Sequence, residues 1–169
     1  MSMIILVAGL SGVGKTTFCK KVSSSNSRTL HIVASSVQKR CNETDFNSNQ
    51  LNLIEEINKI VAESTYEIFL IDGHLFIKNK KVPIAAIRKL HLRAIVFIYE
   101  EANTIIHRRE IDELRKRNVE TQSQVIKSLE EQLEYCNYIS KELDLPLVIL
   151  QPSKQDTVLE FSQFISLLN

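Results

Sequence analysis

The sequence predicts an α/β fold in which helices cover both faces of a parallel sheet of five strands. Short apolar runs alternate along the chain with longer stretches of helical periodicity, and this alternation is typical of strand–helix–strand units wound into one sheet. The apolar runs carry no Asp, Glu, Lys or Arg, which indicates strands buried on both faces. With 169 residues and no internal repeat, the chain is expected to form a single domain over residues 1–169.

Each apolar run predicts a strand, and the stretches between the runs predict helices. The expected strands are Met3 to Val7, Thr29 to Val33, Ile68 to Ile71, Ala94 to Tyr99 and Leu147 to Leu150. The expected helices lie near Lys15 to Ser25, Ser36 to Cys41, Gln50 to Ser64, Ala102 to Lys116, Ser123 to Leu143 and Asp156 to Leu168. The fifth helix ends before Pro146, because a proline disfavours helical backbone at the residue that precedes it. Polar loops are expected at Asn42 to Asn49 and at Lys78 to Pro83.

The loop after the first strand has the sequence of a phosphate-binding loop. Gly9 to Thr16 reads GLSGVGKT and fits the pattern G-x-x-x-x-G-K-[ST] directly after an apolar run, as this motif requires. Its glycines let the backbone turn so that successive N–H groups converge on one point. The helix that begins near Lys15 adds the positive end of its dipole, which favours phosphate oxygens. A glycine-rich turn that binds nothing is the alternative, and the flanking strand and helix argue against it.

This motif predicts that the chain binds magnesium ATP. Lys15 is expected to reach the β- and γ-phosphates, and the hydroxyl of Thr16 to ligate Mg²⁺. The fold class is therefore the three-layer P-loop NTPase fold.

The net charge, the cysteines and the apolar N-terminus indicate which partners and which cellular compartment to expect. The net charge of +1 gives no overall attraction to nucleic acid or membranes. Three cysteines without C-x-x-C spacing argue against a zinc site or a disulfide framework and favour a reduced compartment. The glycine loop interrupts the apolar N-terminus too early for a signal peptide or a membrane span. We expect a cytoplasmic protein with no membrane partner.

The third strand is followed by the residues LIDGH, which we interpret as part of the site. Ligands of open parallel sheets collect at the carboxyl ends of the strands. Asp72 is expected there to hold Mg²⁺ or its waters together with Thr16, with an ordinary turn or helix-capping aspartate as the alternative. Gly73 would allow a substrate to approach the backbone. His74 would contact the substrate as a neutral donor, or serve as a structural histidine.

The segment after the fourth strand is rich in arginine. Its sequence RREIDELRKRNVET contains four arginines: Arg108, Arg109, Arg115 and Arg117. Guanidinium groups on an element that can close over the site suit the negative charge that develops during phosphoryl transfer. The interleaved acidic residues support the alternative of an exposed helix with ion pairs between neighbouring turns.

The same segment resembles the closing segment of archaeal-type adenylate kinases. The P-loop, the IDGH sequence, the strand AIVFIYE, and LVILQ followed by a helix ending in FISLL resemble that family in order and spacing. The resemblance implies a short arginine-rich lid over about residues 108–122 and an acceptor-binding insert over about residues 34–66. It also implies a homo-oligomer.

The resemblance also implies which residues contact the ligands. ATP would be held by Gly9, Ser11, Gly12, Val13, Gly14, Lys15, Thr16 and Thr17, and on the adenine side by Gln151, Pro152 and Ser153. Lys15 and the four lid arginines would stabilise the transferred phosphoryl group. The acceptor would lie among Ser35, Ser36, Lys39, Arg40, Asp72, Gly73 and His74. The sequence departs from the family here, because GHLF lacks the usual arginine after the glycine.

These observations predict a nucleoside monophosphate kinase that transfers the γ-phosphoryl of magnesium ATP, with AMP as the expected acceptor. An ATP-binding or ATP-hydrolysing switch in assembly is one alternative, and a kinase of another small molecule or of a polynucleotide end is another. The stretch from Lys78 to Arg93 carries six cations and no carboxylate. It is either a solvated loop with an amphipathic helix whose Ile84, Ile87 and Leu90 face the sheet, or a contact surface for acceptor phosphate, RNA or a protein.

Overall fold

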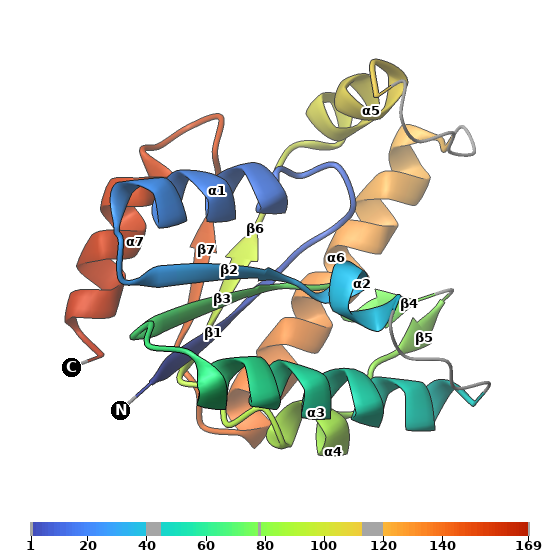
Figure 1. Cartoon of the computed structure of the whole chain (residues 1–169). Helices are drawn as coiled ribbons and strands as arrows, with labels where there is room; N and C mark the ends of the chain where they lie inside the picture. Colours follow the sequence, from blue (N-terminus) through green and yellow to red (C-terminus); the bar gives the residue numbers. More distant parts are fainter. Residues whose placement is uncertain (1, 40–44, 78, 113–119, 169) are drawn as a thin grey trace.

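A central parallel sheet organises the chain. The computed structural model describes residues 2–39, 45–77, 79–112 and 120–168. The sheet contains β1 (Met3–Ala8), β2 (Thr29–Val33), β3 (Ile68–Asp72), β6 (Ala94–Ile98) and β7 (Leu147–Leu150). All neighbours run parallel, in the order β2-β3-β1-β6-β7 (Figure 1). The predicted α/β fold with a parallel sheet of five strands is confirmed.

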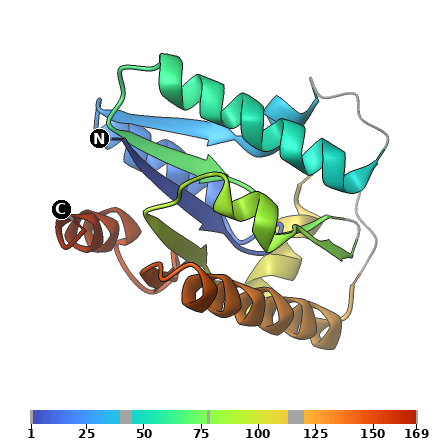
Figure 2. The ribbon, with the colours of Figure 1, turned by 90° about the horizontal axis from the view of Figure 1, so that it is seen from below.

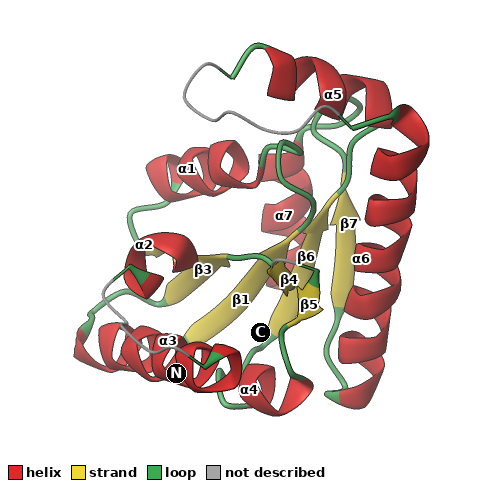
Figure 3. Cartoon of the chain, turned by 90° about the vertical axis from the view of Figure 1, so that its right-hand side faces the viewer, coloured by secondary structure: helices red, strands yellow, loops and turns green. Residues whose placement is uncertain are grey.

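Helices cover both faces of this sheet, which makes three layers (Figure 3). On one face lie α3 (Phe46–Glu63), α4 (Ile84–Arg88) and α6 (Gln122–Glu142), with α4 between the other two (Figure 2). On the other face lie α1 (Lys15–Ser25) and α7 (Thr157–Ser166). The short helices α2 (Ala34–Gln38) and α5 (Ala102–Glu110) follow β2 and β6.

Alternation along the strands divides the core into two halves. Ile4 and Leu6 of β1 pack into the half under α3, whereas Ile5 and Val7 pack into the half under α1. This period of two is the geometry of a strand, and residues of both faces are apolar because helices bury both. In the described part of the chain, no helix is long and apolar enough to cross a membrane.

Several element boundaries differ from those expected. The helix α3 begins at Phe46 rather than Gln50, because the Asp45 carboxylate caps it by accepting from the Ser48 N–H at 2.9 Å. Residues 46–49, which were expected in a loop, therefore belong to this helix. The helix expected from Ser36 begins at Ala34 and ends at Gln38. The helix expected over Ala102 to Lys116 ends at Glu110, and Ile111 and Asp112 after it are not helical. Cys41 and Lys116 themselves lie outside the described residues.

The basic stretch forms a hairpin where only a loop was expected. Strands β4 (Phe76–Ile77) and β5 (Lys80–Lys81) pair antiparallel. The ammonium of Lys81 lies 5.1 Å from the ring centroid of Tyr135, and that of Lys80 lies 5.6 Å from the ring centroid of Phe46. These cation–π contacts account for two of the six cations. The helix α4 buries Ile87, as its amphipathic pattern predicted. A partner for this stretch stays a prediction.

The helix α6 starts with a capping box. The Thr121 hydroxyl accepts from the Gln124 N–H at 3.3 Å, and the Gln124 side chain accepts from the Thr121 N–H at 2.8 Å.

We predict that Thr121→Ala lowers the free energy of unfolding by about 1 kcal/mol, because the first turn of α6 loses its side-chain acceptor. Urea unfolding measures this change. Thr121→Ser keeps a capping hydroxyl and should stay near wild type; equal losses in both variants would contradict the capping role.

Candidate functional site

The loop after β1 has the backbone that its glycines were predicted to supply. Gly9, Gly12 and Gly14 have φ values of 142°, 96° and 103°, which residues with a side chain rarely adopt. A Cβ on Gly9 would also lie 2.5 Å from the carbonyl oxygen of Ile98, so this position excludes larger residues on two grounds. The turn ends at Gly14, and α1 begins at the next residue.

Lys15 places its charge inside this loop. The side chain is buried, and its Nζ donates to the carbonyl oxygens of Gly9 at 2.7 Å and Leu10 at 3.2 Å. A buried ammonium is costly unless it is bonded, and these carbonyls hold it at the point where the motif predicts phosphates. Thr17, in the first turn of α1, lines the same cavity as Lys15.

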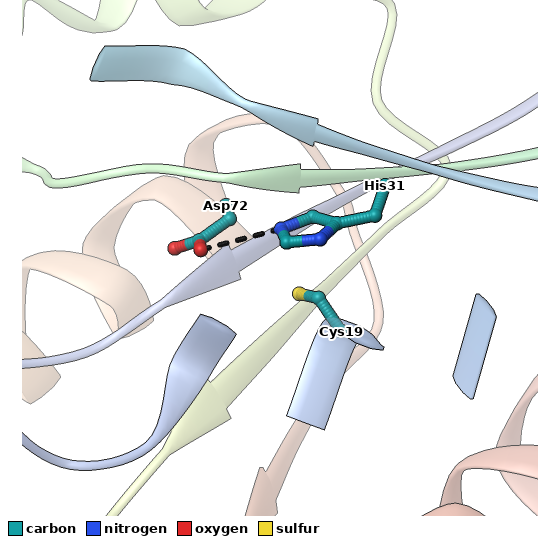
Figure 4. A group of neighbouring side chains, drawn as sticks. All are labelled: Cys19, His31 and Asp72. Atoms are coloured by element: carbon teal, nitrogen blue, oxygen red, sulfur yellow. Dashed lines mark hydrogen bonds and ion pairs between the residues drawn. The ribbon is translucent and has the colours of Figure 1, made fainter. Parts of the chain in front are cut away.

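Asp72 lies beside the loop, as predicted. It ends β3, in register with Val7 of β1, so the strand pairing brings its carboxylate to the edge from which the loop leaves. The Thr16 hydroxyl donates to Asp72 Oδ2 at 2.6 Å, and His31 Nε2 lies 3.3 Å from the same oxygen (Figure 4). The hydroxyl and carboxylate oxygens are ligands that Mg²⁺ favours.

The surroundings of Asp72 keep it ionised. Burial by itself would raise the pKa of this carboxyl, but hydrogen bonds with His31 and Thr16, together with the positive charge of Lys15, outweigh burial and hold the pKa below its ordinary value. Ionised Asp72 is therefore available to a cation at neutral pH.

A third side chain, Cys19 of α1, completes a cluster behind Asp72. The potential ligand atoms of Cys19, His31 and Asp72 lie within 4.8 Å of one another (Figure 4). Burial, with the nearby charge of Asp72, raises the pKa of the Cys19 thiol, so the sulfur is a protonated thiol and a poor metal ligand. Neither Cys19 nor His31 lines the cavity, whereas Thr16 and Asp72 do. The Thr16 and Asp72 oxygens are therefore the pair that fits Mg²⁺.

Two of the predicted arginines lie directly against the loop. Arg108 donates to the carbonyl oxygen of Val13 at 2.9 Å, and Arg109 donates to that of Ser11 at 2.9 Å. Both come from α5, and Arg109 also pairs with the carboxylate of Glu120. Arg115 and Arg117 lie outside the described residues.

Glu100 belongs to this arrangement and was not predicted from the sequence. It follows β6, is completely buried, and pairs with Arg108 at 3.2 Å. Its other oxygen accepts from the Ser153 hydroxyl at 2.5 Å and from the Gln151 amide at 3.4 Å. Glu100 thus joins α5 to the loop expected on the adenine side. The available signal was an acidic residue at the end of an apolar run, as at Asp72.

A cavity of about 1050 Å³ extends from the loop past Asp72 and under α3. The predicted residues Ser35, Gly73, His74 and Pro152 line it. Ser36 and Lys39 are exposed and do not line it, which departs from the prediction. Neighbouring residues of a helix do not share a face, so Ser36 lies away from the side of α2 on which Ser35 lines the cavity. Arg40 lies outside the described residues.

Comparisons with known proteins agree with this geometry. The family described as AAA domain matches residues 8–127 of the 169-residue chain. No curated protein matches the chain significantly.

Solved structures share the fold. A shikimate kinase from Bacteroides thetaiotaomicron has a TM-score of 0.61 and 14% identity, over 97% of this chain and 98% of that one. A shikimate kinase from Acinetobacter baumannii, in complex with shikimate, has a TM-score of 0.61 and 17% identity, over 99% and 93%. A sugar kinase from Janibacter sp. HTCC2649 has a TM-score of 0.59 and 14% identity, over 97% and 94%. The chain therefore shares its fold with these kinases, while the predicted archaeal adenylate kinase type is not confirmed.

His31, which lies 3.3 Å from Asp72 Oδ2, should contribute to the free energy of unfolding in a pH-dependent way. Because the pKa of Asp72 is lowered in the folded chain, its contribution is present above the unfolded-state pKa of about 3.9 and is lost as the pH falls through the lower folded-state value. His31→Leu should lower the free energy of unfolding by about 1.5 kcal/mol at neutral pH, with the difference shrinking toward about pH 3. Urea titrations at both pH values test this. The exposed His107→Leu is the control, and a pH-independent loss would contradict the link to Asp72.

Glu100 should contribute to stability as a buried charge partner. Glu100→Gln leaves the Arg108 guanidinium without its carboxylate, and since Arg108 is 35% exposed we expect a loss of about 2 kcal/mol, below the range for fully buried pairs. Chemical unfolding measures it. Glu101→Gln breaks only a surface pair with Lys154 and should leave the unfolding free energy unchanged; equal effects of the two variants would refute the buried-pair argument.

Proposed function

The chain belongs to the AAA domain family, and we propose that it is a phosphotransferase that moves the γ-phosphoryl group of magnesium ATP to a small molecule. The observation that carries this proposal is a continuous cavity of about 1050 Å³ that begins at Lys15 and Thr16 and continues past Asp72 under α3. An ATPase switch needs only the first part of that space. The second part has room for an acceptor.

Within this proposal, the loop and α1 hold the nucleotide. The backbone N–H groups of residues 9–17 and the Lys15 ammonium bind the β- and γ-phosphates. Thr16 and Asp72 would hold Mg²⁺, which when bound neutralises charge on the phosphate oxygens. Pro152, which is expected to contact the adenine, lines the same cavity.

The arginines would supply further positive charge for the phosphate oxygens. Arg108 and Arg109 donate to carbonyl oxygens of the loop and can turn from them to phosphate oxygens, because both guanidinium groups already lie against this loop. We propose that they stabilise the transferred group together with Arg115 and Arg117 of the lid.

The acceptor predicted from the sequence is AMP. An acceptor phosphate needs charge-assisted contacts, and Lys39 lies outside the cavity lining, while Arg40 is not among the described residues. A hydroxyl compound is the second candidate, favoured by the apolar lining under α3 and by solved structures of the same fold that are named shikimate kinase and sugar kinase. The proposal of phosphoryl transfer holds for either acceptor.

Lys15 tests the transfer. Lys15→Met removes the ammonium but keeps an unbranched side chain, and we expect turnover to fall by about a hundredfold or more, because one preorganised charge on the phosphates is lost. A coupled assay of ADP formation from magnesium ATP, with AMP, with hydroxyl compounds and with no acceptor, measures this. Lys20→Met, an exposed lysine on the same helix, is the control. Unchanged turnover in Lys15→Met would refute the proposal.

A further inference from the structure

The half of the cavity under α3 has an apolar wall. Gln50, Leu53, Ile54 and Ile57 line it at the spacing of one helix face, and all four are buried. Opposite them, apolar side chains from the segments after β3 complete the wall: Leu75, Ile77, Val82, Ile87 and Leu90. A ligand in this half would bury an apolar surface against α3.

Charge in the cavity lies at the other end. The described lysines and arginines that line it are Lys15, Lys21 and Arg108, which belong to α1 and α5. Among the described lining residues of α2, α3, β4 and α4, none is Lys, Arg, Asp or Glu. Among the described residues, none would offer a cation to a carboxylate or phosphate placed under α3, so such a group would lose its water there at a cost in free energy.

One polar group in this wall lacks a partner. The side-chain amide nitrogen of Gln50 is buried and has no hydrogen-bond partner within the part of the chain that the structure describes. Three other buried side-chain atoms of the described residues share that condition, on Thr29, Asn49 and Gln132, and none of these residues lines the cavity. A buried donor without a partner costs free energy, and a ligand that accepts from it recovers that cost. Gln50 therefore indicates where a bound molecule presents an acceptor atom.

We infer that the phosphoryl acceptor is an uncharged hydroxyl compound. Its apolar ring or chain lies against Leu53, Ile54 and Ile57, and its carbonyl oxygen or ring nitrogen accepts from Gln50 Nε2. Its hydroxyl lies toward Asp72. The inference rests on the proposed function and replaces a phosphate-bearing acceptor by a neutral one.

The reaction balances as a simple transfer. The hydroxyl oxygen forms a bond to the γ-phosphorus, and the bond from that phosphorus to the β–γ bridging oxygen breaks, with its electron pair leaving on ADP. The hydroxyl proton is released to water. The products are the phosphate monoester and ADP.

Matched pairs of acceptors test the charge preference. Hydroxyl-bearing fragments would be assayed as neutral compounds and anionic analogues, including thymidine with its monophosphate, adenosine with AMP, and the methyl ester of hydroxymethylbenzoate with the free acid. The coupled ADP assay and calorimetry with a non-hydrolysable ATP analogue measure turnover and binding. We expect neutral members to exceed their anionic partners by about tenfold or more in kcat/KM. Preference for the anionic members, or no neutral compound bound, would overturn the inference.

Gln50 tests the contact itself. Gln50→Leu removes the buried, unpartnered amide nitrogen, so the variant should fold about as well as wild type. The KM for the neutral acceptor should rise about tenfold, with magnesium ATP binding unchanged. Gln132→Leu is the matched control, because Gln132 is also buried with an unpartnered amide atom but does not line the cavity. An equal KM for the neutral acceptor in Gln50→Leu and Gln132→Leu would refute the contact between the acceptor and Gln50.

Calorimetry with magnesium ATP distinguishes a failure of the proposed function from a failure of the neutral-acceptor inference. A chain that does not bind magnesium ATP contradicts the proposed function. A chain that binds it and phosphorylates anionic acceptors contradicts only the neutral acceptor.

Discussion

The pairing of β1 with both of its neighbours is the constraint on which the site depends. Val7 lies in register with Asp72 on one side and with Val96 on the other, so the loop that leaves β1 lies between the ends of β3 and β6. Thr16 can therefore reach Asp72, and Arg108 can contact both the loop and Glu100. A shift of β3 by one residue would turn its side chains to the opposite face of the sheet and remove Asp72 from Thr16.

Features carried by short segments could be predicted from the sequence. The glycine loop, the five strands and the position of Asp72 follow from local patterns and from the rule that parallel strands end at one edge. Glu100, like Asp72, is an acidic residue at the end of an apolar run. It is one of two adjacent glutamates, however, and such a pair is also typical of the polar start of a helix. His31 lies inside the edge strand β2 and contacts Asp72, 41 positions later in the sequence, so no local pattern identifies it.

The acceptor half of the cavity depends on packing that the sequence does not encode locally. An amphipathic pattern indicates which side of α3 is apolar, but it does not distinguish a glutamine facing solvent from one facing a cavity. The expected helix started at Gln50, whereas the capping aspartate starts it at Phe46 and places Gln50 in the second turn. The family resemblance predicted a phosphate-bearing acceptor from the order of motifs, while the lining under α3 is apolar.

The central position of β1 also affects how the chain can fold. The strand closest to the N-terminus pairs Met3 with Ile68 and Ile5 with Ala94, so neither of its neighbours is available until long after it leaves the ribosome. Non-local parallel pairing of this kind slows folding, because loop closure must come before the contacts that reward it. During synthesis, β1 is therefore an apolar strand with two unpaired edges until most of the sheet has been made, and such edges favour aggregation.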